Sequence, residues 1–274
     1  MKSGNTIILV SIAAIVLLAV LVPLNAFIWN KFFPAKETSG QQLKVLESET
    51  SSLQLTNKDF TSKITNKYLT FNPGTKYIYE GKTEEGTERT EVYATGETKK
   101  VMGVDALVVW DRVWLNDELV EDTKDWLAQD KYGNIWYFGE DSKELINGKI
   151  ASRKGSWEAG VDGAQPGIVM KANPKVGDKY RQEYYPGEAE DMGEIIALGV
   201  KIKVKYDSFT NCLQTKDINP LEPGDEEYKY YCPEVSGLVY EVAIEDGEFQ
   251  QLIDIKKDSD KKSAKIIEEP VEEL

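Results

Sequence analysis

The chain has 274 residues with 33 basic and 47 acidic side chains, so its formal net charge is −14. It contains no histidine, which excludes Ser-His-Asp triads, Cys-His dyads and His-ligated zinc sites. The charge argues against nucleic-acid binding, because no basic surface is available to release phosphate counterions.

The N-terminal segment is predicted to be a transmembrane helix. Residues 6–28 are apolar, and no charged side chain falls between Lys2 and Lys31. At about 1.5 Å per residue, a helix of this length crosses a hydrocarbon core of about 30 Å. Aromatic residues near Lys31 suit the membrane interface. We therefore expect an uncleaved anchor over 1–35; the alternative is a signal peptide cleaved at a poor site near Ala26.

Three further regions are expected after this anchor. Residues 36–70 are rich in Ser, Thr, Lys and Glu and are predicted to form a stalk. Residues 71–256 hold nearly all the aromatic and β-branched runs and are predicted to be one domain. Residues 257–274 are mostly charged and are expected to be a disordered tail.

The domain is predicted to be mainly all-β. Alternating runs separated by turn residues indicate an antiparallel meander, curled into a half-barrel or closed into a barrel. One short helix is expected over 188–198, after Gly187. The principal predicted strands are 76–80, 89–95, 104–115, 118–129, 180–185, 200–206, 209–215, 226–232, 238–244 and 249–255.

An aromatic strip lies on the predicted strand 104–115. Trp110 and Trp114 share one face, with Arg112 between them. With a two-residue turn at Asn116-Asp117, Glu121 would face Arg112, and Thr123 would face Trp110. The strip could stack on glycan rings, but large aromatic residues dominate β cores, so a core face is favoured.

The segment 154–178 is the predicted binding region. It is long, glycine-rich and irregular, and such loops are often functional. It could cover an open end of the barrel or plug the interior, and Trp157 is the expected anchor. Arg181 and Glu183 follow on the next strand and are expected to share a face. The candidate binding residues are Trp157, Glu158, Asp162, Ile168, Met170, Arg181 and Glu183.

A cluster of acids offers a weak metal site. Glu188, Glu190 and Asp191 carry oxygen ligands that would suit calcium, but they lack EF-hand spacing. The alternative is a solvated helix face with acids near its N-terminus. No catalytic residue and no cofactor is expected, since no recognisable catalytic motif occurs.

The two cysteines, Cys212 and Cys232, lie on predicted strands. A hairpin symmetric about Glu222 pairs residues whose numbers sum to 444, so the two cysteines would face each other. Opposed residues have Cα atoms about 4.5–5.5 Å apart, within disulfide range. We therefore predict a disulfide; the alternative is two buried thiols.

Four stretches resemble a family of uncharacterised exported bacterial proteins that are membrane- or lipid-anchored. They are DWLAQDKYGNIWYFGE (125–140), GSWEAGVDGAQPGIVM (155–170), VGDKYRQEYYPGEAEDM (176–192) and YYCPEVSGLVYE (230–241). The chain departs from the family pattern at Cys232 and in the turn that follows it. VKYDSFTNCL (204–213) is more loosely similar to LolA-like half-barrel domains. The resemblance implies an exported β domain without an assigned activity.

The expected function is a non-catalytic binding or structural role at the cell envelope. The chain would be a single-pass membrane protein with its C-terminal domain outside the cytoplasm, and its partner would be an envelope protein or an apolar or glycan ligand. One alternative is a carrier or sensor of an apolar ligand in a half-barrel cavity. A second is a glycan-active enzyme that uses carboxylates, two of them in an open cleft.

Overall fold

The computed structural model describes residues 56–257 and the strand at 272–273. These residues are all-β apart from one short 3-10 helix, η1 (Asn57–Asp59). The first strands are β1 (Phe60–Thr61), β2 (Thr75–Lys82), β3 (Thr87–Val101), β4 (Val104–Leu115), β5 (Glu118–Asp130), β6 (Ile135–Ile146), β7 (Lys149–Ser152), β8 (Trp157–Glu158) and β9 (Gln165–Met170). The rest are β10 (Lys179–Arg181), β11 (Glu183–Tyr184), β12 (Met192–Lys203), β13 (Ser208–Ile218), β14 (Glu226–Cys232), β15 (Gly237–Ala243), β16 (Phe249–Lys257) and β17 (Glu272–Glu273).

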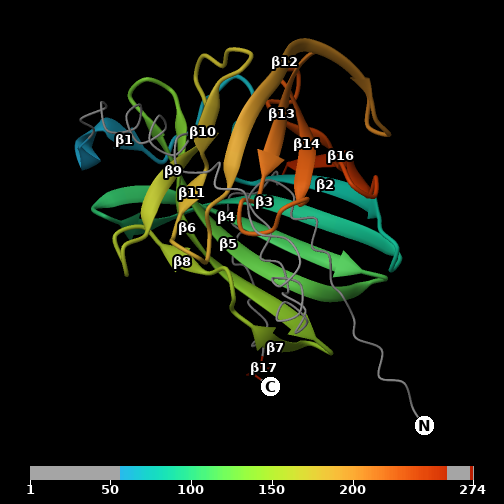
Figure 1. Ribbon diagram of the computed structural model, residues 1–274, viewed down its shortest axis with the longest axis horizontal. Helices are drawn as coiled ribbons and strands as arrows, with labels where there is room; N and C mark the ends of the chain where they lie inside the picture. Colours follow the sequence, from blue (N-terminus) through green and yellow to red (C-terminus); the bar gives the residue numbers. More distant parts are fainter. Residues whose placement is uncertain (1–55, 258–271, 274) are drawn as a thin grey trace, which may run out of the picture.

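The strands form a nearly closed antiparallel barrel. Strands β2–β6 make one meander and β12–β16 a second, and β16 pairs with β2. On the other side, β9 pairs with β6 and β11, while β10 pairs with β12. Figure 1 shows the green strands of the first meander as one wall, with the orange strands β12–β14 beside it. The barrel, one of the two predicted shapes, is therefore the one observed.

Closure is interrupted at Gln182, between β10 and β11. The Gln182 N–H donates to the Asp191 carbonyl at 2.8 Å, while β11 turns to pair with β9. Gly167 on β9 lies so close that a Cβ there would be 2.4 Å from the Gln182 backbone. Only glycine allows this approach. Gln182 therefore marks a seam in the wall.

The expected helix over 188–198 is wrong. Residues 192–203 form β12, which pairs with β13 through several bulges. Gly193 faces Tyr180, and a Cβ at Gly193 would lie 2.6 Å from its ring. Met, Glu, Leu and Ala are good helix formers, but the preference is small in free energy, and cross-strand packing overrides it.

The β body extends beyond the expected bounds of 71–256. Phe60 and Thr61 pair with β5, and Ile64 and Leu69 are buried, so the described end of the expected stalk packs on the body. Within the expected tail, β17 pairs in parallel with β7. The expected anchor over 1–35 lies outside the described residues. Within the described part, no helix is long and apolar enough to span a membrane.

The turn at Asn116-Asp117 is confirmed, but the pairing predicted beyond it is wrong. Both residues have positive φ, and Trp114 pairs with Leu119. A bulge at Val120 then shifts the register, so Arg112 pairs with Asp122, and Trp110 pairs with Lys124. The extra residue sends Glu121 and Thr123 to the opposite face of the sheet.

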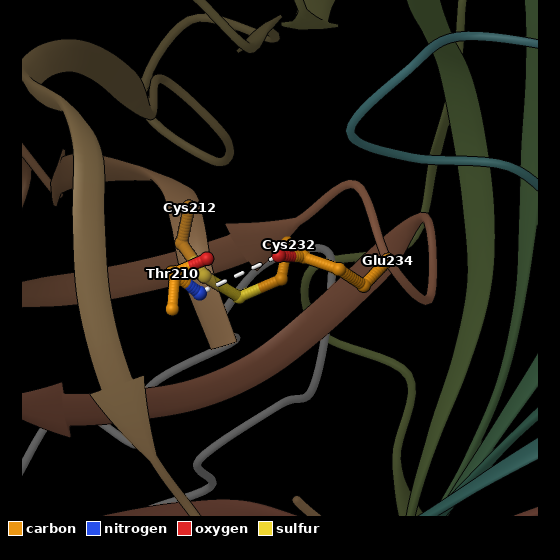
Figure 2. Close-up of a disulfide and its surroundings, with 4 residues drawn as sticks. All are labelled: Thr210, Cys212, Cys232 and Glu234. Atoms are coloured by element: carbon orange, nitrogen blue, oxygen red, sulfur yellow. Dashed lines mark hydrogen bonds between the residues drawn. A yellow bond between two sulfur atoms is a disulfide. The ribbon is translucent and has the colours of Figure 1, made fainter. Parts of the chain in front are cut away.

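The predicted disulfide is confirmed. β13 and β14 pair in the predicted register, for example Leu213 with Tyr231. Cys212 and Cys232 are disulfide-bonded, their Cα atoms lie 4.2 Å apart, and both are fully buried. Figure 2 shows the bond beside Glu234, whose Oε1 accepts from the Thr210 backbone N–H at 3.4 Å.

We predict that replacing both cysteines with alanine lowers the free energy of unfolding by about 3 kcal/mol, because the bond constrains the unfolded chain. Urea denaturation with and without reductant measures the effect. The wild type should lose this stability on reduction, whereas the double variant should not respond. Two freely alkylated thiols in protein from its native compartment would contradict the prediction.

Candidate functional site

A pocket of 490 Å³ lies on the outer face of the wall formed by β3–β6, beside β8. Ligand pockets typically combine apolar surface with a few convergent polar groups, as this one does. Lys99 lies over the Trp126 ring, 3.3 Å from its centroid, and pairs with Glu158 at 2.8 Å. The lining residues are Glu97, Lys99, Val108, Lys124, Trp126, Glu140, Asp141, Ser156, Trp157 and Glu158.

The aromatic strip continues from this pocket along the outer face. Lys124 lines the pocket and also lies over the Trp110 ring, at 6.0 Å. The Arg112 guanidinium stacks on Trp110 at 4.1 Å and lies 5.0 Å from Trp114. The favoured prediction of a core face holds for Trp110, which is buried, but not for Arg112 and Trp114, which are half-buried. Trp110 is buried beneath cationic side chains, on the side of the sheet that faces away from the barrel interior.

The barrel interior is acidic. Side chains alternate along each strand, so the bulge at Val120 and the registers above direct a set of carboxylates inward. Among the buried side chains of the described chain, Lys229 is the one cation. The inward acids are Glu88, Asp111, Glu121, Asp125, Glu140, Glu183, Asp191, Asp217, Glu227 and Glu241.

Lys229 compensates only one part of this interior. Its Nζ lies 3.2 Å from Asp217, 3.4 Å from Glu227 and 3.9 Å from Glu241. Burial lowers the pKa of Lys229, but these carboxylates more than offset it and hold the pKa well above its usual value. Asp111 Oδ1 has no hydrogen-bond partner within the described part of the chain, and burial raises the pKa of Asp111 well above the usual range.

Two carboxyls on β5 titrate near neutral pH. Burial raises the pKa of Glu121 to about 7, although Thr123 donates a hydrogen bond to it at 2.8 Å. Burial also raises the pKa of Asp125 to about 8, although the Tyr137 hydroxyl donates to it at 2.8 Å. These groups therefore bind protons in the folded barrel that the unfolded chain would release.

The segment 154–178 forms part of the wall and is neither a lid nor a plug. β8 and β9 within it pair with β6, so the expectation of an irregular loop is wrong over these strands. Trp157 is buried, and its ring packs edge-on against Tyr137 at 5.2 Å. Nothing in the sequence of this segment revealed its pairing with β6, which is set by the barrel around it.

The candidate binding residues are dispersed. Trp157 and Glu158 line the pocket, whereas Asp162 is exposed in the turn between β8 and β9. Ile168 packs partly buried against the core, and Met170 is fully buried. The structure therefore brings only the first two to a common site.

Arg181 and Glu183 do not share a face, contrary to expectation. The bend at Gln182 breaks the alternation, so Arg181 is half-buried and stacks on Tyr184 at 3.9 Å. Glu183 is buried in the interior, and burial, with Asp191 nearby, raises its pKa well above the usual range. The Trp157 Nε1 has no hydrogen-bond partner among the described residues.

The weak metal candidates do not converge. Glu188 is exposed, Glu190 accepts from the Gly187 N–H at 2.8 Å, and Asp191 points into the barrel. In the described part of the chain, the potential ligand atoms that lie within 4.8 Å of one another belong to Cys212, Cys232 and Glu234. Its sulfur atoms are bonded to each other, so they are not available as thiolate ligands.

Comparisons with known proteins add little. No family model and no curated protein matches the chain. One solved structure, described as that of a putative lipoprotein from Parabacteroides distasonis ATCC 8503, is similar with a TM-score of 0.39 and 14% identity. The match covers 70% of this chain and 99% of that one. A TM-score of 0.39 is too low to assign a fold family or a role. The resemblance of the four sequence stretches to exported bacterial proteins therefore stays a prediction.

We predict that Trp157→Ala lowers the free energy of unfolding by about 3–5 kcal/mol, because it leaves a cavity beside Tyr137. Thermal and urea denaturation measure the loss. Asp162→Ala, at an exposed turn position in the same segment, is the control. An unchanged melting temperature for Trp157→Ala would show that the ring is not a packing residue.

We also predict that stability falls as pH rises from about 4 to about 8. The unfolded chain releases the protons of Glu121 and Asp125 near pH 4.5 and 3.8, whereas the folded barrel holds them to about 7 and 8. The contribution of these two groups is therefore fully present below the unfolded pKa values and is lost as pH rises through about 7 and 8. Each such proton contributes a slope of about 1.4 kcal/mol per pH unit within this window.

Urea denaturation at several pH values tests this. Asp125→Asn removes one titrating group and keeps an acceptor for the Tyr137 hydroxyl. The free energy of unfolding of this variant should therefore fall less steeply with pH than that of the wild type. The control, Asp105→Asn, alters an exposed carboxylate that pairs with Lys100, and it should keep the wild-type slope. Equal slopes for the wild type and Asp125→Asn would refute the assignment.

Proposed function

We propose that this chain is a membrane-anchored, extracytoplasmic β domain with a non-catalytic binding role at the cell envelope, and that its ligand is a glycan. The observation that carries the proposal is the 490 Å³ pocket on the outer face. Its volume lies within the usual range for ligand sites, about 300–1,000 Å³.

The lining suits a polyhydroxylated ligand. Val108 and Trp126 form the apolar base of the pocket, although both are largely buried and Lys99 lies over the Trp126 ring. Lys99 and Lys124 can donate to hydroxyl oxygens, and carboxylates such as Glu158 can accept from hydroxyl groups. A sugar hydroxyl both donates and accepts, so it matches this mixture.

The proposed location is supported by two features. The apolar segment 6–28 supports attachment to a membrane. The buried disulfide supports an oxidising compartment, because such bonds are rare in reducing cytosol. An acidic interior disfavours the alternative of an apolar ligand inside the barrel, since burying carboxylates against an apolar ligand leaves them without partners.

A carboxylate-based glycan-active enzyme stays the second candidate. Glu140 lies at the pocket, is buried, and has a pKa raised well above the usual range by that burial, as a general acid requires. Its partner in the strand register is the inward Asp125, which places the side chain toward the interior. This orientation favours binding without hydrolysis.

Calorimetric titration of the full chain in uncharged detergent tests the proposal. The probes are hexasaccharides of glucose, N-acetylglucosamine and galacturonate. We expect at least one to bind, and we expect Lys124→Ala and Glu158→Gln each to weaken that binding about tenfold, or about 1.4 kcal/mol, with little change in melting temperature. Lys216→Ala, which removes a lysine paired with Glu226 on the opposite wall, should have no effect.

Two results would overturn the proposal. One is the absence of binding by every probe. The other is binding that the pocket variants leave unchanged. The release of new reducing ends during incubation would instead favour the enzyme, and that activity should then depend on Glu140.

A further inference from the structure

We propose that Lys76, Arg89 and Arg112 form a second subsite that binds the anionic group of an acidic oligosaccharide whose other end occupies the pocket. This inference rests on the proposed function and specifies its ligand class. The three cations belong to neighbouring strands, β2, β3 and β4, on the outer face of the wall.

The three cations surround a single carboxylate, Glu91. Lys76 Nζ lies 2.6 Å from Glu91 Oε2, Arg112 lies 3.6 Å from the same oxygen, and Arg89 pairs with Oε1. The Glu91 side chain is 8% exposed, whereas those of Arg89 and Lys76 are 47% and 30% exposed. The carboxylate is therefore at the base of the cluster, and the cations face solvent.

Within 4 Å, the three cations meet one carboxylate, which leaves a formal excess of +2. Glu80, which faces Arg89 across the strands, pairs with Lys205. Over the described residues, no second carboxylate lies within 4 Å of these cations. Asp122, which faces Arg112 across the strands, pairs with Lys143 at 3.6 Å. On a chain of net charge −14, this local excess complements an anionic ligand.

Aromatic rings hold the cations in place. Arg112 stacks on Trp110 at 4.1 Å, Arg89 lies 5.5 Å from Trp114, and Lys76 lies 6.0 Å from Tyr93. Stacking leaves the guanidinium edges free to bind a carboxylate or phosphate through two parallel hydrogen bonds. Because the side chains are already ordered, binding costs less conformational entropy.

The Trp110 indole is an independent sign of a missing acceptor. Trp110 is 7% exposed, and its Nε1 has no hydrogen-bond partner among the described residues. A buried donor without an acceptor destabilises the fold. The Arg112 guanidinium stacks on the same ring, so an anion that binds Arg112 would lie next to a donor that lacks an acceptor.

The distance to the pocket sets the size of the ligand. Arg112 and Val108 are four residues apart on β4, or about 13 Å, and point to the same face. Lys124 lies between them, over Trp110 and at the rim of the pocket. A monosaccharide cannot reach both positions, whereas an oligosaccharide that carries carboxylates or phosphates can.

The test compares ligands that differ only in charge. Galacturonate hexasaccharide and its uncharged methyl ester are titrated into the full chain in uncharged detergent, together with a glycerol-phosphate hexamer. We expect at least one acidic probe to bind at least tenfold more tightly than the ester. That advantage should shrink as salt rises from about 0.05 to 0.5 M, because screening weakens exposed ionic contacts.

Two variants should weaken the binding of the acidic probe, and a third should strengthen it. Arg89→Gln and Arg112→Gln should each weaken the acidic probe about tenfold and leave the ester unchanged. Glu91→Gln should strengthen the acidic probe, since the cluster then carries +3; a purely structural cluster would not produce this gain. Lys216→Gln is the matched control, and melting temperatures confirm that each variant is folded.

The outcomes separate the two proposals. If the ester and both acidic probes bind equally, and the arginine variants change nothing, the second subsite is refuted while the pocket stands. If no probe binds, the proposed function fails together with it. If vesicles of phosphatidylglycerol bind through the same arginines and the oligosaccharides do not, the cluster recognises a membrane surface, and the inference is wrong.

Discussion

The alternation of side chains along the strands of one wall determines most of what this molecule can do. In β3–β5, one set of positions faces the interior and holds carboxylates such as Asp111 and Asp125. The other set faces outward and holds tryptophans covered by cations. Because the period of a strand is two residues, the two chemistries alternate along the chain yet lie on opposite sides of the sheet.

This arrangement departs from the usual distribution of polarity, because carboxylates share the interior with the apolar core. Large aromatic side chains normally fill a β core, and carboxylates normally face water. Here Lys229 compensates part of the buried negative charge, whereas the outer rings are covered by the Lys99 ammonium and the Arg112 guanidinium. The outer face therefore combines apolar surface with fixed charge, which is the composition of a recognition surface.

Local sequence signals predicted the features that depend on neighbouring residues. The strand pattern, the turn at Asn116-Asp117 and the disulfide between Cys212 and Cys232 all follow from periodicity and turn chemistry. The helix expected over 188–198 failed because pairing with β13 outweighs weak helix propensity. The pocket was found only at Trp157 and Glu158, since Lys99 and Trp126 meet across strands far apart in sequence.

The bulge at Val120 also determines where the chain can change length. Leu119 faces outward opposite Trp114, and Glu121 faces inward opposite Val113. Val120, between them, is therefore an extra residue with no partner on β4. Loss of Val120 would leave a regular strand with every later side chain on its present face. Loss of a residue beyond the bulge, such as Thr123, would instead turn Lys124 inward and Asp125 outward. A one-residue deletion in β5 therefore keeps the later side chains on their faces only where it removes the bulge.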